Sequence, residues 1–170
     1  MKLGNYEKAL RICRQEVVPI FEQLDHKLGR AITLGLIADL LEARGDYVEA
    51  LLIYQEEVLP AFEQLGYVYE QSLVLYKIAN LFHKSGKYND SLRICKRLLR
   101  MCEQIGNKSV FLKVRTKIGI NYLARGAAGD RQRGLRILKS ILQDAQRLKL
   151  SEAGQIADAI RQAENSPESN

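Results

Sequence analysis

The chain is poor in the residues that enzymes use for acid–base or nucleophilic chemistry. Its 170 residues include only two histidines, His26 and His83, and three cysteines. Catalysis needs an acid, a base or a nucleophile held against a partner group, and neither histidine shares a short motif with a cysteine. We therefore expect no enzymatic activity and no catalytic residues.

The cysteines also lack the spacing of a metal site or a disulfide framework. Their number is odd and no Cys-x-x-Cys pair occurs, which excludes the usual zinc-ligand patterns. The glycines form neither a phosphate-binding nor a dinucleotide-binding fingerprint. The sequence thus predicts no metal and no cofactor, and it predicts free thiols in a reducing, cytoplasmic compartment.

Long apolar runs are missing as well. No stretch of about 18 uncharged apolar residues occurs, so we expect no membrane span. The first residues, MKLGNYEK, lack the apolar run of a signal peptide. Hydrophobic residues make up 46% and charged residues 27% of the chain, which is ordinary for a globular domain with its own core.

The chain does contain a nine-residue segment that is repeated, and the repeats are evenly spaced. Residues 16–24 read EVVPIFEQL, residues 57–65 read EVLPAFEQL, and a diverged third copy begins at Cys102. The glycines of a Gly-x-Tyr motif, Gly4, Gly45 and Gly86, stand 41 residues apart. Repetition at a fixed interval predicts a stacked array of structural units.

Each unit consists of two segments of helical length. Asp25, Gly66 and Gly106 divide the units about halfway, and segments of about 18 residues suit helices and exceed strands. Apolar residues recur in steps of three and four, which indicates one buried stripe per helix. These positions are Ala31, Leu34, Ile37, Ala38 and Leu41, then Leu75, Ile78, Ala79 and Phe82, then Ile118, Gly119 and Tyr122. Cys13, Cys95 and Cys102 fall at core positions of the second helices and are predicted to be buried.

The helical segment that contains a proline is one residue longer than the one that lacks it. Pro19 and Pro60 fall inside the second helix, where proline lacks an N–H and clashes with the preceding turn. The following unit has no proline there and is one residue shorter, with 20 residues from Gly86 to Gly106 against 21 from Gly45 to Gly66. We predict that each proline and the extra residue together form a local widening of one helical turn.

The combined pattern of Ile-Ala-x-x-Leu, Gly-x-Tyr-x-x-Ala and a following Tyr resembles the tetratricopeptide repeat (TPR). The common repeat has about 34 residues, so this chain is more similar to the long-repeat branch that includes kinesin light chain, and to repeats of multidomain bacterial TPR signalling proteins. The resemblance covers nearly the whole chain. It implies an all-α, right-handed solenoid of antiparallel helix pairs with about eight helices.

The same pattern predicts the organisation of the chain. A single repeat domain is expected over residues 1–164, followed by a disordered tail at 165–170. Its parts are a half-repeat at 4–25, repeats at 26–66, 67–106 and 107–149, and a capping helix at 150–164. Because the chain begins with half a repeat, we expect it to belong to a larger protein or complex. The longer turn Gly126–Gly129 should make the last repeat the least regular.

The resemblance implies a binding wall on the concave face, formed by the first helix of each pair. The predicted partner-binding residues lie opposite or beside the core stripe: Asp39, Tyr76, Lys77, Asn80, His83, Lys84, Lys113, Thr116 and Lys117. In the resembled family an asparagine on this wall clamps peptide backbone, and Asn80 alone matches that position. We expect a protein or peptide partner, with a passive spacer array as the alternative.

Charge is unevenly distributed along the chain. Residues 1–85 carry a net −3 and residues 86–170 a net +9, which favours an acidic partner for the C-terminal half. An intramolecular scaffold for an attached catalytic domain and RNA or DNA contact are the alternatives. Nucleic acid would contact the basic residues Arg93, Lys96, Arg97, Arg100, Lys113, Arg115, Lys117, Arg131, Arg133, Arg136 and Lys139, but aromatics for base stacking are sparse there.

Overall fold

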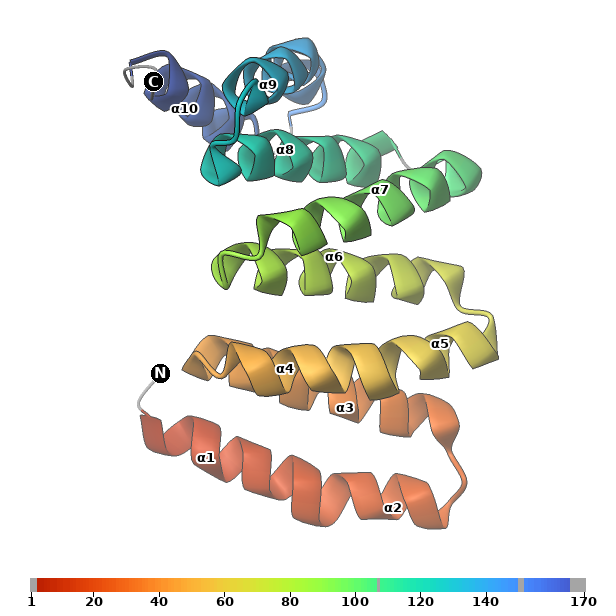
Figure 1. The fold of residues 1–170 in the computed structure, drawn as a ribbon. Helices are drawn as coiled ribbons and strands as arrows, with labels where there is room; N and C mark the ends of the chain where they lie inside the picture. Colours follow the sequence, from red (N-terminus) through yellow and green to blue (C-terminus); the bar gives the residue numbers. More distant parts are fainter. Residues whose placement is uncertain (1–2, 107, 150–151, 166–170) are drawn as a thin grey trace. The chain divides into compact units, whose positions relative to one another are not determined.

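The computed structural model describes residues 3–106, 108–149 and 152–165, and these residues form helices and turns without a strand (Figure 1). The elements are α1 (Leu3–Ile12), η1 (Cys13–Val17), α2 (Val18–Gln23), α3 (Lys27–Arg44), α4 (Tyr47–Ile53), η2 (Tyr54–Val58), α5 (Leu59–Leu65), α6 (Val68–Lys84), α7 (Tyr88–Ile105), α8 (Lys108–Arg125), α9 (Asp130–Arg147) and α10 (Glu152–Asn165). Because α1–η1–α2 and α4–η2–α5 are each one continuous helix, the described residues contain eight helices, as predicted.

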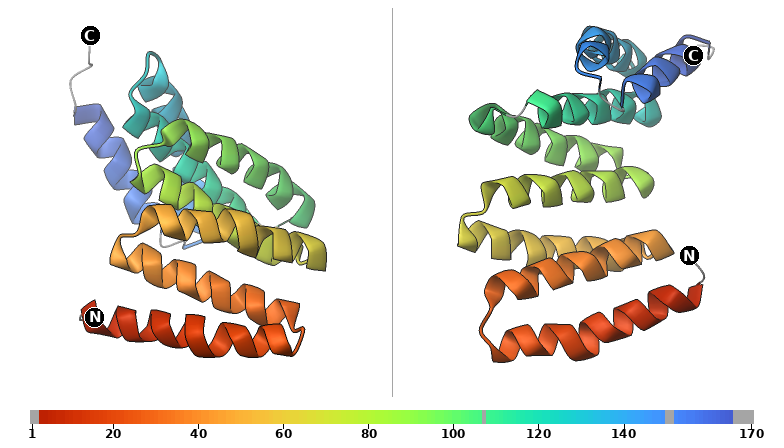
Figure 2. Two further views of the ribbon diagram at one scale, coloured as in Figure 1. Left: turned by 60° about the horizontal axis from the view of Figure 1, so that its bottom comes forward. Right: turned by 180° about the vertical axis from the view of Figure 1, so that it is seen from behind.

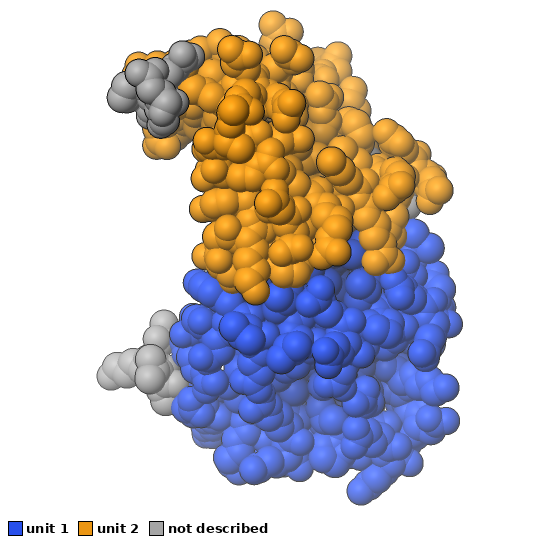
Figure 3. Space-filling model, in the orientation of Figure 1, with its two compact units in different colours: residues 1–81 blue, residues 82–170 orange. Residues whose placement is uncertain are grey.

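The chain divides into two compact units, unit 1 at Met1–Leu81 and unit 2 at Phe82–Asn170 (Figure 3). In unit 1, α3 packs against both α1–α2 and α4–α5. In unit 2, α8 packs against α7 and α9, and α10 packs against α8 and α9. Consecutive helices run antiparallel within each unit (Figure 2). The all-α stack of antiparallel helix pairs is therefore confirmed, while the single-domain boundary at residues 1–164 stays a prediction.

The residues predicted to separate the helices lie in turns with left-handed backbone. Gly45 has a φ of 101°, and the N–H groups of Gly45 and Asp46 donate to the carbonyl of Leu41 at 3.0 and 2.9 Å. Asp25 adopts the same region with a φ of 47°, and the next N–H, of His26, donates to Phe21 O at 2.9 Å. These bonds satisfy the last carbonyls of the helix and fix where the chain reverses.

The predicted core stripes point inward. Ile37 and Ile78 are 1% exposed, and Ile118 is 7% exposed. The three cysteines are buried and free, as predicted. Burial raises the pKa of the Cys95 thiol to about 12 and also raises that of Cys102, so both thiols are protonated near neutral pH and serve as small core side chains.

The widened turn predicted before each proline is present in both helices. Residues Cys13–Val17 and Tyr54–Val58 are π-helical, and Pro19 and Pro60 follow in the first turns of α2 and α5. At the second site the N–H of Leu59 donates five residues back, to Tyr54 O. The π turn carries one extra residue, and it moves the carbonyl that an interior proline ring would strike.

Deleting Glu56 should be tolerated only when Pro60 is replaced as well. The double change, Glu56 deletion with Pro60→Ala, converts the π turn into α-helix like α7 and should leave the melting temperature close to that of the parent. Deletion with Pro60 retained should lower it by about 10 °C, since an interior proline costs about 3 kcal/mol. Thermal unfolding followed by circular dichroism measures the difference, and equal melting temperatures would contradict this account.

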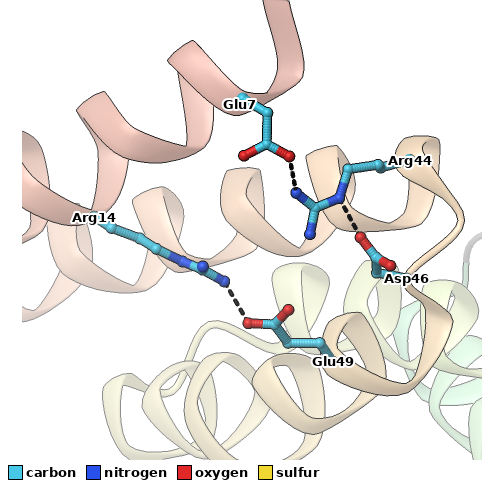
Figure 4. Close-up of polar contacts among 5 residues, drawn as sticks. All are labelled: Glu7, Arg14, Arg44, Asp46 and Glu49. Carbon is cyan, nitrogen blue, oxygen red and sulfur yellow. Dashed lines mark hydrogen bonds and ion pairs between the residues drawn. The ribbon is translucent and has the colours of Figure 1, made fainter. Parts of the chain in front are cut away.

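Ion pairs join the N-terminal helix to the first full helix pair. Figure 4 shows the Arg44 guanidinium between the carboxylates of Glu7 on α1 and Asp46 after α3, and Arg14 donating to Glu49 on α4. The Arg14 and Glu49 side chains remain 43% and 47% exposed. Because exposed ion pairs contribute little to stability, these contacts align α1 with α3 and α4, and apolar packing supplies the stability.

Helices α8 and α9 approach closely at two glycines. A Cβ on Gly119 would lie 2.6 Å from Leu138 Cγ, and a Cβ on Gly134 would lie 2.9 Å from the carbonyl oxygen of Gly119. The second contact is the tighter constraint, because a backbone atom in the middle of a helix cannot move away as a side chain can.

The longer turn before α9 is organised by a buried carboxylate. Asp130 is 0% exposed. It accepts two hydrogen bonds of 2.7 Å from the Arg125 guanidinium and one of 3.1 Å from the N–H of Ala127. Hydrogen bonding from Arg125 holds the pKa of Asp130 below its ordinary value. The longer turn is thus held by a charge-assisted fork in addition to its left-handed glycines, Gly126 and Gly129.

Helix α10 occupies the place predicted for a capping helix. Its Ile156 and Ile160 are 0% and 8% exposed and share a core cluster with Leu112 of α8 and Ile141 of α9. The disordered tail was predicted from Asn165, but Asn165 is the last residue of α10. Residues 150–151, where the predicted helix would begin, and residues 166–170 of the predicted tail lie outside the described residues.

Candidate partner-binding face

In unit 1, α3 and α6 each have a row of solvent-accessible residues on the side that does not face the core. We define the α3–α6 face as Ile32, Leu36 and Asp39 on α3 together with Tyr69, Leu73, Tyr76, Lys77 and Asn80 on α6. Steps of three and four residues place each set on one side of its helix. The two helices are joined across this face by an ion pair between Lys77 and Asp39. The predicted residues Asp39, Tyr76, Lys77 and Asn80 therefore belong to one surface.

The Asp39 carboxylate is held by two donors. The Tyr54 hydroxyl on η2 and the Lys77 ammonium both donate to Asp39 Oδ1. Burial of Tyr54 and its hydrogen bond to Asp39 raise the pKa of the phenol, so it remains a donor. The Lys77 ammonium also lies 5.7 Å from the centre of the Tyr54 ring, which adds a cation–π attraction.

Asp39 and Lys77 nevertheless stay open to solvent. Their side chains are 42% and 38% exposed. A carboxylate that is held by a core tyrosine keeps its second oxygen available to an incoming N–H. The pair therefore offers one acceptor and one donor to a partner in a fixed orientation.

Large apolar side chains lie in the turns that precede this pair on the two helices. Ile32 is 57% exposed, Leu36 49%, Tyr69 50% and Leu73 41%. Single exposed apolar residues are normal, but four on the same face of two helices that an ion pair joins form a patch of the kind that marks interaction sites. Sequence reasoning missed Leu36 and Tyr69, although their helical spacing to Ile32 and Leu73 could have revealed them.

Asn80 lies at the end of this patch as a half-buried residue. In the described part of the chain its side-chain amide takes no part in a hydrogen bond. A primary amide both donates and accepts, so it can pair with both groups of a peptide unit. Tyr76, also half-buried, does form a polar, ring or electrostatic contact.

In unit 2, His83 is half-buried and begins a chain of polar side chains that continues into the core. Its Nδ1 lies 2.7 Å from Asn121 Oδ1, and Asn121 Nδ2 donates to Ser91 Oγ at 2.7 Å. Asn121 and Ser91 are both 0% exposed. Burial lowers the pKa of His83 against the opposing effect of the Asn121 hydrogen bond. His83 therefore ties the last turn of α6 to α8 and, through Asn121, to α7, and its part in partner binding stays a prediction.

The predicted residues of α8 do not form an exposed wall. Thr116 is 3% exposed and its hydroxyl donates to Leu112 O at 2.9 Å, so its placement on the wall was wrong. The stripe through Thr116 faces the next helix of the stack: Leu112 joins the core cluster with α10, and Ile120 and Leu123 pack against that cluster.

The lysines near this stripe differ in exposure. Lys113 and Lys117 are half-buried, and Lys84 is exposed. Burial is the main cause that lowers the pKa of Lys117, and the positive charge of Lys84 lowers it further. Lys84 and Lys117 therefore form a like-charged pair.

Metal sites and membrane-spanning helices are absent from the part of the chain that the structure describes. Residues 3–106, 108–149 and 152–165 contain no cluster of three His, Cys, Asp or Glu side chains that could hold a metal ion. Over the same ranges, every helix is too short or too polar to cross a membrane.

Comparisons with known proteins find repeats of the expected kind in part of the chain and a similar fold. The family model described as tetratricopeptide repeat matches residues 33–65 and 74–109. A crystal structure of nearly identical TPR-like repeats from a Podosopora anserina kinesin light chain-like protein, in a single-substitution variant, superposes with a TM-score of 0.73 at 15% identity. The superposition covers 94% of this chain and 77% of the chain in that crystal structure. A second structure of such repeats from the same organism gives a TM-score of 0.67 at 14% identity, covering 95% of this chain and 88% of that one. No curated protein matches the sequence.

Proposed function

Because this chain contains tetratricopeptide repeats, which generally serve as protein-interaction scaffolds, we propose that it binds an extended peptide or partner domain on the α3–α6 face. The observation that carries the proposal is the group of exposed apolar residues, Ile32, Leu36, Tyr69 and Leu73, on the same face as the solvent-accessible Asp39–Lys77 pair. Apolar area surrounding a few oriented polar groups is the usual composition of a recognition surface.

Each part of the face has a role in this proposal. Leu36 and Leu73 supply apolar area that is lost from water on binding. Asn80 bonds the peptide backbone, and the Asp39–Lys77 pair fixes the register of polar groups on the partner. The protein is proposed to act by binding alone, within a larger protein or complex, and not as an enzyme.

Paired charge substitutions test the α3–α6 face. Leu36→Glu with Leu73→Glu should abolish recovery of the partner in quantitative affinity enrichment from the source cells. Leu52→Glu with Val48→Glu makes the same change at apolar residues of α4 that are 49% and 74% exposed and lie outside the face, and it should leave recovery unchanged. Circular dichroism verifies that both variants fold.

The partner recovered with the parent chain then identifies the mode of binding. A peptide from that partner, titrated by calorimetry, should bind the parent and the α4 variant equally, and Asn80→Ala should weaken it by about tenfold, the usual consequence of losing a pair of buried hydrogen bonds. Equal recovery by the α3–α6 variant would refute the proposal. Recovery of nucleic acid that vanishes steeply with added salt would favour the phosphate-contact alternative.

A further inference from the structure

A cavity of about 270 Å³ opens on unit 2 between α7 and α8, and it shares no residue with the α3–α6 face. We call it the cationic pocket, and its lining is Asn89, Leu92, Arg93, Lys96, Arg100, Tyr122 and Arg125. The four residues Asn89, Arg93, Lys96 and Arg100 follow one another in steps of four, three and four along α7, so they form one side of the pocket.

Helix α8 supplies the other side in a fixed position. The Arg125 guanidinium donates to Asn89 Oδ1 at 2.6 Å and so connects the end of α8 to the start of α7. Its Nε and Nη2 each donate one hydrogen bond to the buried Asp130. The guanidinium carbon lies 5.3 Å from the centre of the Tyr122 ring. Arg125 is therefore pre-organised, which limits the ordering cost of ligand binding.

The positive charge of the lining is only partly balanced. Arg125 is neutralised by Asp130, and Arg93 by Asp90 at 2.9 Å. Lys96 and Arg100 are exposed and form no ion pair within the described residues. Two uncompensated cations thus face the same cavity from successive turns of one helix. The ligand that would balance them is a dianion.

From this arrangement we propose that the cationic pocket binds a phosphate monoester, carried on a phosphorylated partner protein or on a small phosphate compound. A phosphate monoester has a charge of about −1.5 to −2 at pH 7 and three acceptor oxygens, which match one ammonium and one planar guanidinium. A carboxylate would leave one cation unbalanced. Nucleic acid fits less well, because Tyr122 is the only aromatic residue of the lining and Arg125 already lies over its ring.

Nuclear magnetic resonance titration of the 170-residue chain tests this site. The probes are inorganic phosphate, N-acetyl-phosphoserine amide, inorganic sulfate and a ten-nucleotide oligouridine. Saturable shifts are expected for the amides of residues 89–100 and 122–125 with both phosphate probes. Lowering the pH from 7.5 to 5.5 should weaken binding of N-acetyl-phosphoserine amide several-fold, because the second pKa of a phosphate monoester is about 6, while sulfate binding should not change.

Matched variants decide between a site and a general electrostatic effect. Lys96→Gln with Arg100→Gln should weaken phosphate binding by at least about tenfold, since two charge-assisted contacts are lost. Lys108→Gln with Arg136→Gln changes the net charge equally at exposed positions outside the pocket and should alter binding by less than about twofold.

Each remaining outcome is decisive as well. Tighter binding of phosphoserine amide than of inorganic phosphate supports a phosphorylated protein as the source, and equal binding supports a small phosphate compound. Shifts distributed over all basic residues, or equal losses in the two double variants, would overturn the proposal. So would binding of oligouridine at concentrations where the phosphate monoesters leave residues 89–100 unshifted.

Discussion

Gly134→Val is expected to lower the free energy of unfolding of unit 2 by about 3 kcal/mol, the upper part of the usual range for overpacked cores. A side chain at this position would place its Cβ 2.9 Å from Gly119 O and 2.9 Å from Leu123 Cδ2. Leucine can change rotamer, but the carbonyl is fixed in the hydrogen-bonded middle of α8. Helices α8 and α9 must therefore separate, and the cluster of Leu138 and Ile141 beneath them loosens.

Urea denaturation and native-state hydrogen exchange measure this effect. Faster exchange should be concentrated at the amides of residues 112–145, which report on the α8–α9 contact. Gly154→Val is the matched control, because a Cβ on Gly154 in α10 meets nothing within 4 Å, and it should change stability by less than about 0.5 kcal/mol. Equal destabilisation by the two substitutions would show that helix propensity, rather than close approach, explains the glycine.

Arg125→Met should destabilise unit 2 by a similar amount, about 3 kcal/mol, because it leaves the fully buried Asp130 carboxylate without its charged partner. Arg93→Met removes an arginine from an exposed pair with Asp90 and should cost less than about 1 kcal/mol. Chemical denaturation of both variants measures the contrast. Equal, small effects would mean that water replaces the Arg125 guanidinium at Asp130.

The loss caused by Arg125→Met should also depend on pH. The pKa of Asp130 in the folded protein lies below its ordinary value, chiefly because Arg125 donates to it. The stabilisation is therefore fully present above about pH 4, the pKa expected in the unfolded chain, and it disappears as the pH falls through the lower folded pKa. The difference between parent and variant should shrink below about pH 4. A difference that stays constant to about pH 2 would contradict the role of the carboxylate.

The sequence predicted the repeat architecture well because each of its signals is local. Gly45 and Asp25 mark turns that need left-handed backbone, and the spacing of Ile37 and Ala38 identifies a helix face without reference to any other helix. The same applies to Pro19 and Pro60, whose extra residue is visible by counting. Such features depend on the chain within one or two turns, and the structure bears them out.

The candidate site was predicted less well because it depends on which neighbour covers each face. Residues opposite or beside the buried stripe were predicted to be exposed. This holds for Asp39 and Lys77 but not for Thr116, which is buried. Nothing within α8 reveals that its stripe faces the next helix, because the answer depends on how α10 packs. The hydrogen bond of His83 could not be predicted for the same reason, since its partner Asn121 lies 38 residues away.

The π turns limit how this array could gain or lose repeats. A unit with the widened turn has one more residue than a unit without it, so the two kinds are not interchangeable building blocks. Recombination could join the first half of a helix that has the π turn to the second half of a helix that lacks it, or the reverse. One product would have a proline without its π turn, and the other would have every later side chain rotated by about 100°, the angle per residue of an α-helix. Duplications that copy whole helices avoid both faults, and consensus designs should keep the two lengths as separate templates.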